Sequence, residues 1–579
     1  MNDEIAGPKS QVAPILRPFR DALDALSFPL PLGSQGEGEL IRQDILNQLS
    51  DYVIPRYDSL EAPLLAVFGG STGSGKSTLV NSILGENVSQ ASALRPITRR
   101  PILVHHPDDA HWFTGQRIFP HLARVTSHRE ETGEDIETSN ELELRSSDRV
   151  PRGLALLDSP DIDSVVAENR QLAAQFLAAA DLWVFVTTAA RYADAIPWAM
   201  LDDAAQRNVV VAMILNRVPA GTGALIRPDL DRMLAERGLE HAPLFMLSEQ
   251  ELDDDGHVTS ADVEPIRGWL EGLAEDAAVR ASVARQTLGG TVDVLLADSE
   301  GALSAYDEQI AAVDALRWDV TTAFDSALDS ISRAVSDGTM LRGEVLSRWQ
   351  DVVGTGEWAR KLEQGVSTLR DKITGFFRPQ VDTAHVDEAL EDSLYSLIVS
   401  EADQANAAVA HAWSRGIGGE LAQQARSRIS DSEQRSEAAA QLVRDWQSDL
   451  IAMIRAEGDS KRMTARALAF GVNAVGTALI IVVFASTGGL VGGEIAVAGG
   501  TAVLAQRVLE AVFGVDAVRK MAASARENLA RRVKDFLSAD ADAWQAALDD
   551  VGISRRARED FAVALMALRR AKDADRRAR

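Results

Sequence analysis

The stretch "PLLAVFGGSTGSGKSTLVNSILG" (residues 63–85) decides the fold of the first half of this chain. It starts as a continuous apolar run, which predicts a buried strand, and passes into a turn rich in glycine and serine. Residues 70–77 of that turn fit the pattern G-x-x-x-x-G-K-[ST], and a predicted helix follows. Glycines let the backbone curl until several N–H groups face one anion. The order of strand, loop and helix therefore predicts a phosphate-binding loop, with a chance Gly/Ser turn as the alternative.

The groups of this loop have separate predicted roles. Lys76 is expected to reach the β and γ phosphates of a nucleotide, and the Ser77 hydroxyl is expected to ligate Mg²⁺. The helix that follows points the positive end of its dipole at the bound anion. We predict nucleotide contacts for the loop and the residue after it: Gly70, Ser71, Thr72, Gly73, Ser74, Gly75, Lys76, Ser77 and Thr78.

The composition narrows the class of protein. A chain of 579 residues is too long for one core, so two or three domains are expected. A formal net charge of −27 argues against a general affinity for nucleic-acid phosphates. There is no cysteine, which excludes disulfides and thiolate metal sites. The polar N-terminus "MNDEIAGPKSQVAP" has no apolar signal-peptide core, so we expect the protein to start in the cytoplasm.

Apolar runs alternate with helical patterns over residues 62–250. The runs are "PLLAVFGG", "RPILVHH", "GLALLDSP", "DLWVFVTTA", "NVVVAMILNRV" and "APLFMLSE". Most are continuous, which suits strands buried on both faces of a mostly parallel sheet. We therefore predict a three-layer α/β domain over residues 61–270.

Strand-like runs vanish outside this domain, and helical spacing replaces them. Apolar residues recur every three or four positions at Val320, Phe324, Leu328, Ile331 and Val335, as on one face of an amphipathic helix. Several tryptophans of this region, including Trp318, Trp413 and Trp446, are interpreted as packing anchors. We predict an all-α stalk over residues 271–464, joined by a helical segment at residues 1–60 and by C-terminal helices with a basic tail at residues 515–579.

A second acidic element is expected to end a neighbouring strand. Asp158 follows the apolar run "GLALL", and we predict that it holds Mg²⁺ through water. The alternative is a strand-end Asp that caps the next helix.

The order of these motifs resembles that of a Ras-like GTPase, and specifically of the bacterial dynamin-like GTPases. It runs from the phosphate loop through "RPITRRP", "LLDSPD", "ILNRV" and "FMLSE". The resemblance implies GTP as substrate, Mg²⁺ as cofactor and hydrolysis as activity. It also implies that Thr98 closes over Mg²⁺ and the γ phosphate and acts in catalysis with Lys76, unless Thr98 is only part of a proline-bounded loop. Asn216, Arg217 and Ser248 would contact the base.

The sequence departs from that family at three positions. Asp161 stands where a Gly usually meets the γ phosphate, and a carboxylate near a phosphate is repulsive. Pro219 stands where an Asp usually accepts two hydrogens of guanine, which leaves guanine specificity open. Thr72 stands where dynamins place a Gln that positions the attacking water. Thr72 and Arg191 remain catalytic candidates, Arg191 either as an arginine finger or as a surface residue of its loop.

A long apolar segment at residues 465–514 predicts a membrane-inserting hairpin. No residue from Ala467 to Gly493 is charged, and about 20 apolar residues cross a bilayer core. Cations lie at both outer ends of the segment, which predicts that both ends are cytoplasmic. The candidate membrane residues are Leu468, Phe470, Ile480, Ile481, Val482, Phe484, Leu490 and Val503. The alternatives are shallow insertion and a buried core hairpin in a soluble bundle.

Together these features predict a membrane-remodelling GTPase. The family resemblance implies that GTP-dependent dimerisation of the α/β heads moves the stalk and thereby remodels, tethers or fuses a membrane. Membrane lipid and a second copy or a related dynamin-like protein are the expected partners, without nucleic acid, at the cytoplasmic face of the cell membrane. A membrane-associated P-loop ATPase and a GTP-binding membrane scaffold with low turnover remain as alternatives.

Overall fold

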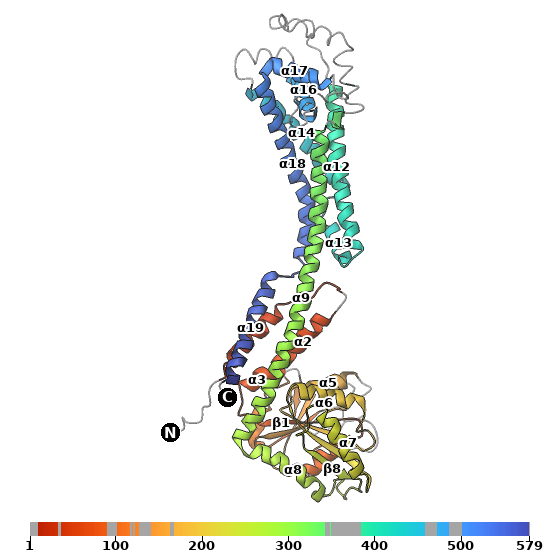
Figure 1. Cartoon of the computed structure of the whole chain (residues 1–579), viewed down its shortest axis with the longest axis vertical. Helices are drawn as coiled ribbons and strands as arrows, with labels where there is room; N and C mark the ends of the chain where they lie inside the picture. The colour runs from red at the N-terminus through yellow and green to blue at the C-terminus, as the bar shows by residue number, and fades with distance from the viewer. Residues whose placement is uncertain are drawn as a thin grey trace, which may run out of the picture. The chain divides into compact units, whose positions relative to one another are not determined.

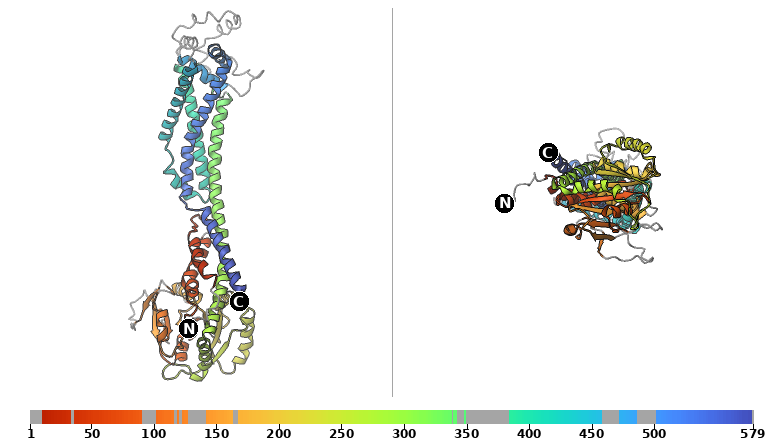
Figure 2. Two further views of the ribbon diagram at one scale, coloured as in Figure 1. Left: turned by 90° about the vertical axis from the view of Figure 1, so that its left-hand side faces the viewer. Right: turned by 90° about the horizontal axis from the view of Figure 1, so that it is seen from below.

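A computed structural model of the chain describes residues 10–32, 36–89, 101–115, 118–119, 122–126, 141–162, 167–337, 339–341, 348, 384–457, 472–485 and 501–577. The contacts between residues divide the chain into two compact units. Unit 1 comprises Met1–Phe28, Gly33–Glu308 and Ser554–Arg579, and unit 2 comprises Pro29–Leu32 and Gln309–Ile553. Figures 1 and 2 show the elements of both units.

One eight-stranded sheet forms the centre of the α/β part of unit 1. Its strands are β1 (Leu64–Gly70), β2 (Ile102–His105), β3 (Ala123–Val125), β4 (Glu141–Ser146), β5 (Leu154–Asp158), β6 (Leu182–Thr188), β7 (Val210–Val218) and β8 (Leu244–Ser248). They lie in the order β3-β4-β2-β5-β1-β6-β7-β8. All neighbours run parallel except β2 and β5. The prediction of a mostly parallel sheet is confirmed.

Helices cover both faces of this sheet. On one face, Leu64, Ala66 and Phe68 of β1 pack in a single cluster with α4 (Lys76–Leu84) and α8 (Ser260–Glu275). Successive residues of a strand face opposite sides. Accordingly, a Cβ added to Gly69 would lie 3.1 Å from Leu177 of α5 (Ala167–Ala178) on the other face. Two further helices follow β6 and β7, namely α6 (Ala195–Gln206) and α7 (Gly223–Ala235). The strands β1, β2, β5, β6 and β7 are therefore buried on both sides, which explains their continuous apolar runs.

Helices from both ends of the chain complete unit 1. They are α1 (Ala13–Asp24), α2 (Glu37–Gln48), the short η1 (Leu49–Val53) and α3 (Ile54–Tyr57), the first part of α9 (Ala277–Ser336), and α19 (Arg555–Arg577). Phe19 of α1 packs against Phe561 of α19, with ring centroids 5.5 Å apart. The Arg558 guanidinium pairs with Asp307 of α9 at 2.8 Å. Side-chain packing thus joins segments more than 500 residues apart in sequence.

A buried carboxylate connects these helices to the sheet. Asp181 precedes β6, and its Oδ1 accepts hydrogen bonds from the Tyr52 hydroxyl at 3.0 Å and from Arg56 Nε at 2.9 Å. Its Oδ2 accepts the backbone N–H of Leu65 in β1 at 2.9 Å, and its carbonyl accepts the Thr287 hydroxyl of α9 at 3.1 Å. Four elements of unit 1, namely η1, α3, β1 and α9, therefore meet at one residue.

The described residues of unit 2 are all-helical in their regular structure and have one continuous core. Its elements are the second part of α9, η3 (Thr339–Leu341), α12 (Ala384–Ser414), α13 (Gly419–Arg426), α14 (Ser432–Glu457), α16 (Val472–Ala485), α17 (Thr501–Phe513) and α18 (Val515–Asp549). The predicted apolar stripe of α9 contributes to this core at all five of its positions, which confirms the helical spacing: Val320, Phe324, Leu328, Ile331 and Val335.

Tryptophans pack at two places in the core of unit 2. Trp413 of α12 meets Trp544 of α18 edge to face, with ring centroids 4.9 Å apart. Trp446 of α14 stacks on Phe484 of α16 at 5.8 Å. The interpretation of Trp413 and Trp446 as packing anchors is confirmed. It is wrong for Trp318, which is 68% exposed, because Trp318 lies off the buried stripe of α9.

The described part of the apolar segment lies in the core of unit 2. Within the described ranges, no helix is both long enough and apolar enough to cross a membrane. The 14 residues of α16 extend about 21 Å, against about 30 Å of bilayer core. Four candidate membrane residues are buried in this helix, namely Ile480, Ile481, Val482 and Phe484. Val503 lies on α17, whereas Leu468, Phe470 and Leu490 lie outside the described residues.

Candidate nucleotide-binding site

Four neighbouring strands bring the predicted site residues to one edge of the sheet. β1 ends at Gly70, β5 at Asp158 and β6 at Thr188, and Asn216 lies near the end of β7. Because these four strands run parallel, their carboxyl ends share that edge. The chain turns to opposite faces after β1 and β5, so the edge opens at a topological switch point, where α/β folds bind ligands.

The phosphate loop is held in shape by close backbone contacts. Gly75 has a φ of +93°, and a Cβ there would lie 2.6 Å from the Asn216 amide nitrogen. A Cβ at Gly70 would lie 2.1 Å from the Val186 carbonyl oxygen of β6. Both positions therefore require glycine. The Asn216 amide donates to the Ser74 carbonyl at 2.9 Å, which ties the loop to β7.

Lys76 is enclosed by the loop that it follows. Its Nζ donates to the Gly70 carbonyl at 3.0 Å and lies 2.5 Å from Oδ1 of Asp161. The side chains of Lys76 and Asp161 are 6% and 14% exposed, so this is a largely buried ion pair. The carboxylate that replaces the usual glycine thus binds the lysine that is expected to reach the phosphates.

One carboxylate oxygen of Asp158 accepts hydrogen bonds from two hydroxyl groups. Its Oδ2 accepts hydrogen bonds from Ser77 Oγ and from Ser89 Oγ, both at 2.6 Å. Its Oδ1 is buried and has no hydrogen-bond partner among the described residues. Burial raises the pKa of the Asp158 carboxyl, although the two hydroxyls and Lys76 act in the opposite direction. A buried carboxylate beside hydroxyl oxygens is the hard oxygen donor set that Mg²⁺ prefers, so these residues fit a magnesium ion.

Ser89 is a further residue of the site, through its contact with Asp158. It lies four residues beyond Gly85, which ends α4, and no motif marks it. The Asn81 side chain holds its backbone, because Asn81 Oδ1 accepts the N–H of Ser89 at 2.8 Å and Asn81 Nδ2 donates to its carbonyl at 2.7 Å. The chain after α4 folds back onto this helix, and this brings the Ser89 hydroxyl to Asp158.

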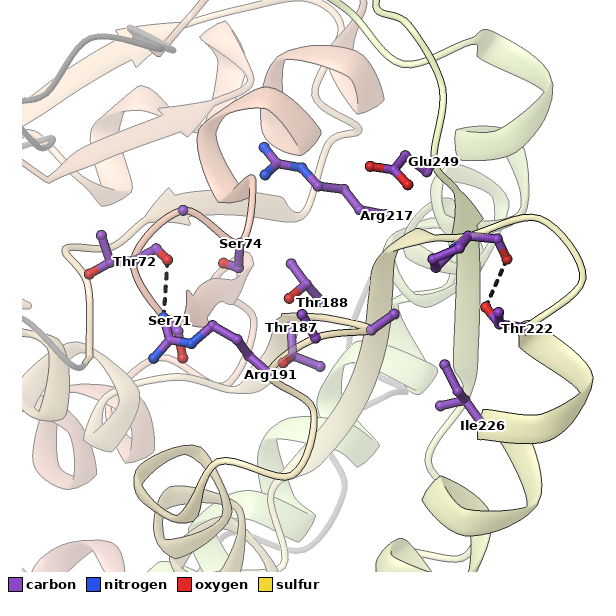
Figure 3. A pocket seen from close by; sticks show the side chains of 14 residues that line it. Ser71, Thr72, Ser74, Thr187, Thr188, Arg191, Arg217, Thr222, Ile226 and Glu249 are labelled. Atoms are coloured by element: carbon purple, nitrogen blue, oxygen red, sulfur yellow. Dashed lines mark hydrogen bonds between the residues drawn. The ribbon is translucent and has the colours of Figure 1, made fainter.

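A pocket of about 540 Å³ extends from the phosphate loop across the ends of β6 and β7. Figure 3 shows Ser71, Thr72 and Ser74 at one end of it and Arg217, Glu249, Thr222 and Ile226 at the other. Its lining residues are Ser71, Thr72, Gly73, Ser74, Thr187, Thr188, Ala189, Ala190, Arg191, Arg217, Pro219, Thr222, Ile226 and Glu249. Within the described ranges, the buried hydroxyls of Ser71, Ser74 and Thr187 have no hydrogen-bond partner, so the phosphate end offers unused polar groups.

Of the three residues predicted to contact a base, only Arg217 lines the pocket. Arg217 lines the pocket with an exposed side chain and a φ of +54°. Asn216 is buried and is engaged with the phosphate loop. Ser248 ends β8 and is exposed, and it is not among the lining residues, whereas its neighbour Glu249 is.

Two catalytic candidates lie at the phosphate end. Arg191 Nη1 donates to the Thr72 carbonyl at 3.3 Å, which is drawn in Figure 3. Arg191 also pairs with Asp194 at 2.8 Å, and both of these side chains are about two-fifths exposed. Thr98 lies outside the described residues.

A comparison with family models identifies the α/β part of unit 1. Residues 65–216 match the model described as the Dynamin family. The chain carries a GTPase domain of the dynamin family. The match begins in β1 and ends at Asn216, so it includes the phosphate loop, Asp158 and Asp161. The predicted resemblance is confirmed, and with it GTP hydrolysis as the activity of this domain.

Comparisons with other proteins give low overall similarity. No curated protein matches the chain. Two similar structures come from an oligomerised bacterial dynamin pair described as providing a mechanism for long-range sensing and tethering of membranes. They are 11% and 12% identical, cover 96% of this chain each and 98% and 99% of their own, and have TM-scores of 0.40 and 0.41. LeoA, a bacterial dynamin GTPase from ETEC, is 11% identical with a TM-score of 0.21, covering 97% of this chain and 98% of its own.

Proposed function

We propose that this protein binds GTP with Mg²⁺ at the edge of the sheet and couples its hydrolysis to dimerisation of the head and to remodelling, tethering or fusion of membranes. The observation that carries the nucleotide part is the arrangement of Lys76, Ser77 and Asp158 around one loop at the carboxyl ends of β1 and β5. Cations and hydroxyls so placed bind phosphates and a hard divalent ion.

The proposed roles follow from these contacts. The loop N–H groups and the dipole of α4 receive the phosphates, and Lys76 exchanges Asp161 for a phosphate oxygen. Ser77 and Asp158 would hold Mg²⁺, the latter through water, with Thr98 as the third candidate. The ion supplies neutralisation of charge on the phosphates when it is bound. The proposed nucleotide contacts also include Thr78 beside the loop, and Arg217 stacks on the base.

Replacement of the loop lysine tests the nucleotide part. We expect Lys76→Ala to lose binding of a fluorescent GTP analogue, because Lys76 is the cation that the loop encloses and that we propose to bind the phosphates. Arg227→Ala, on the exposed side of α7, is the matched control for loss of one positive charge. Circular dichroism confirms folding of both. Unchanged GTP turnover in Lys76→Ala would contradict the proposed role of the loop in nucleotide binding.

A low-turnover GTP-binding scaffold is the second candidate function. It is favoured by Asp161, which neutralises Lys76 and places a carboxylate next to the site of the phosphates. Neither Thr72 nor Arg191 supplies a general base, since neither side chain accepts a proton at neutral pH. A GTP turnover that does not rise with lipid or with self-association would support the scaffold. An ATPase is the further alternative, and a preference for ATP over GTP would establish it.

The membrane part of the proposal rests on α16. This helix is apolar on all sides, which is typical of helices in a core or in a membrane. We propose that α16 leaves the core of unit 2 and that the segment 465–514 inserts into lipid as a hairpin, fully or at shallow depth, when the protein acts. The cytoplasmic face of the cell membrane is the proposed location, residues 61–270 the head, and the remaining helices the stalk.

Vesicle flotation tests this step. We expect the full chain to float with vesicles of anionic phospholipid, more strongly with a non-hydrolysable GTP analogue than with GDP. A variant lacking residues 467–506 should stay at the bottom of the gradient. Flotation of that variant would show that lipid is bound elsewhere.

Dimerisation of the head is a separate proposal with its own measurement. We expect the mass of the full chain in light scattering to double with GTP and a transition-state analogue. A related dynamin-like protein is the proposed alternative partner if the chain alone stays monomeric.

A further inference from the structure

The base end of the pocket lacks the carboxylate that usually reads guanine. Guanine presents two adjacent donors, N1–H and the 2-amino group, and an ionised carboxylate accepts both at once. Pro219 occupies the position of the usual Asp, and its side chain has no acceptor. A GTPase without such an acceptor loses its means of rejecting other purines, since selectivity comes from paired polar groups.

One lining residue offers the missing group from a different strand. Among the described residues that line the pocket, Glu249 is the only one with a carboxylate side chain. Glu249 follows β8 directly, and β8 is the neighbour of β7 in the sheet. Its side chain lies beside Arg217, at the end of the pocket away from Ser71 and Thr72 (Figure 3).

The backbone holds Glu249 close to Pro219, which occupies the position of the usual Asp. The N–H of Glu249 donates to the Val218 carbonyl at 2.9 Å, and Ser248 pairs with Val218 in the sheet. The pairing of β7 with β8 is irregular between Leu215 and Val218, where the backbone departs from a regular ladder. Val218, the residue directly before Pro219, is therefore hydrogen-bonded to the residue that carries the carboxylate.

Two other residues that line the pocket complete a site for a purine. The guanidinium of Arg217 is planar and can stack on a base, and Ile226 adds an apolar contact. In the described part of the chain, the Glu249 carboxylate has no hydrogen bond or ion pair and stays exposed to the pocket. The acceptor is therefore available to a ligand.

We propose that Glu249 reads guanine in this site, by accepting N1–H and the 2-amino group in place of the usual Asp. This inference rests on the proposed function, because it takes GTP as the nucleotide. Glu249 determines specificity and touches the base only, so it has no part in hydrolysis itself.

Substitution by the amide exchanges one acceptor for a donor. Glu249→Gln presents an N–H to the 2-amino group of guanine, where two donors oppose each other. The same N–H suits xanthine, which has an oxygen at that position and keeps N1–H. We expect the affinity for GTP to fall at least tenfold and the affinity for xanthosine triphosphate to rise by a similar factor. ATP binding should stay unchanged.

The measurement is a competition of GTP, xanthosine triphosphate and ATP against one fluorescent analogue, with folding checked by circular dichroism. Glu251→Gln is the matched control, because it removes the same charge from an exposed residue that does not line the pocket. Glu249→Asp is the second variant, and it should keep the preference for GTP over xanthosine triphosphate because it keeps the carboxylate.

The outcomes separate this inference from the proposed function. If Glu249→Gln keeps the wild-type order of the three nucleotides, the assignment of Glu249 is overturned, while GTP binding lost in Lys76→Ala still supports the GTPase site. If the wild-type protein prefers ATP, the proposed function fails first. A reversal from GTP to xanthosine triphosphate in Glu249→Gln alone supports the assignment.

Discussion

Lys76 and Asp161 form a largely buried ion pair, with Nζ and Oδ1 2.5 Å apart, inside the loop that is to receive a nucleotide. The carboxylate holds the ammonium group that we propose for phosphate binding. In that proposal nucleotide binding breaks this pair, and Asp161 competes with the phosphates for Lys76.

Removing the charge of Asp161 should strengthen nucleotide binding. We expect Asp161→Asn to bind a GTP analogue about tenfold more tightly, because a hydrogen bond to a charged group contributes about 1.5–3 kcal/mol that binding otherwise has to offset. Titration calorimetry measures the change. Asp148→Asn, on the exposed surface, is the control. Weaker binding in Asp161→Asn would mean that the carboxylate helps to hold the nucleotide.

Loss of Asp181 should destabilise unit 1. Asp181→Ala leaves Arg56 buried without its carboxylate partner. We therefore expect the free energy of unfolding to fall by about 3–5 kcal/mol. Chemical denaturation followed by circular dichroism gives this value. The matched control is Asp58→Ala, whose ion pair with Arg17 is exposed and contributes about 0–1 kcal/mol. Equal losses of stability in the two variants would show that the buried ion pair stabilises unit 1 no more than the exposed one does.

Tyr52 should make unit 1 sensitive to alkaline pH. Burial, followed by the charge of Asp181, raises the pKa of the Tyr52 hydroxyl well above 10.0. A raised folded-state pKa contributes stability below the unfolded pKa near 10, and this contribution is lost as pH rises through the folded value. We expect Tyr52→Phe to be about 1 kcal/mol less stable at pH 7, for the lost hydrogen bond, and the difference to shrink above pH 10. Unfolding curves at both pH values measure it, and a constant difference contradicts the assignment.

A hydrogen bond in unit 2 should hold α16 in the core. The hydroxyl of Thr477, which is 1% exposed, donates to Oδ1 of Asp387 on α12 at 2.6 Å. Removing this acceptor deprives the buried Thr477 hydroxyl of a hydrogen bond and weakens the packing of α16 in the core. We therefore expect Asp387→Ala to float with vesicles at a lower lipid concentration than the wild type. Asp392→Ala, exposed on the same helix, should behave like the wild type. If lipid binding stays unchanged in Asp387→Ala, this contact does not restrain α16.

Much of the GTPase domain could be predicted from short stretches of sequence. The strand, loop and helix from Leu64 to Gly85 depend on the spacing of apolar residues and on the glycines of the phosphate loop. They can therefore be recognised without knowledge of the rest of the chain. The same holds for Asp158 at a strand end and for the stripe that begins at Val320. The apolar length of the segment from Ala467 was also plain, but length alone does not distinguish a core from lipid.

The sequence by itself determined the phosphate loop, the mostly parallel sheet and the helical remainder, because local spacing of apolar residues and glycines specifies each of them. Only the tertiary structure decided that Ser89 reaches Asp158, that Asp161 binds Lys76 and that Glu249 lines the pocket. It also decided that α16 is buried in unit 2. These contacts join residues that are distant in sequence, and they depend on which elements pack together, which no local pattern encodes.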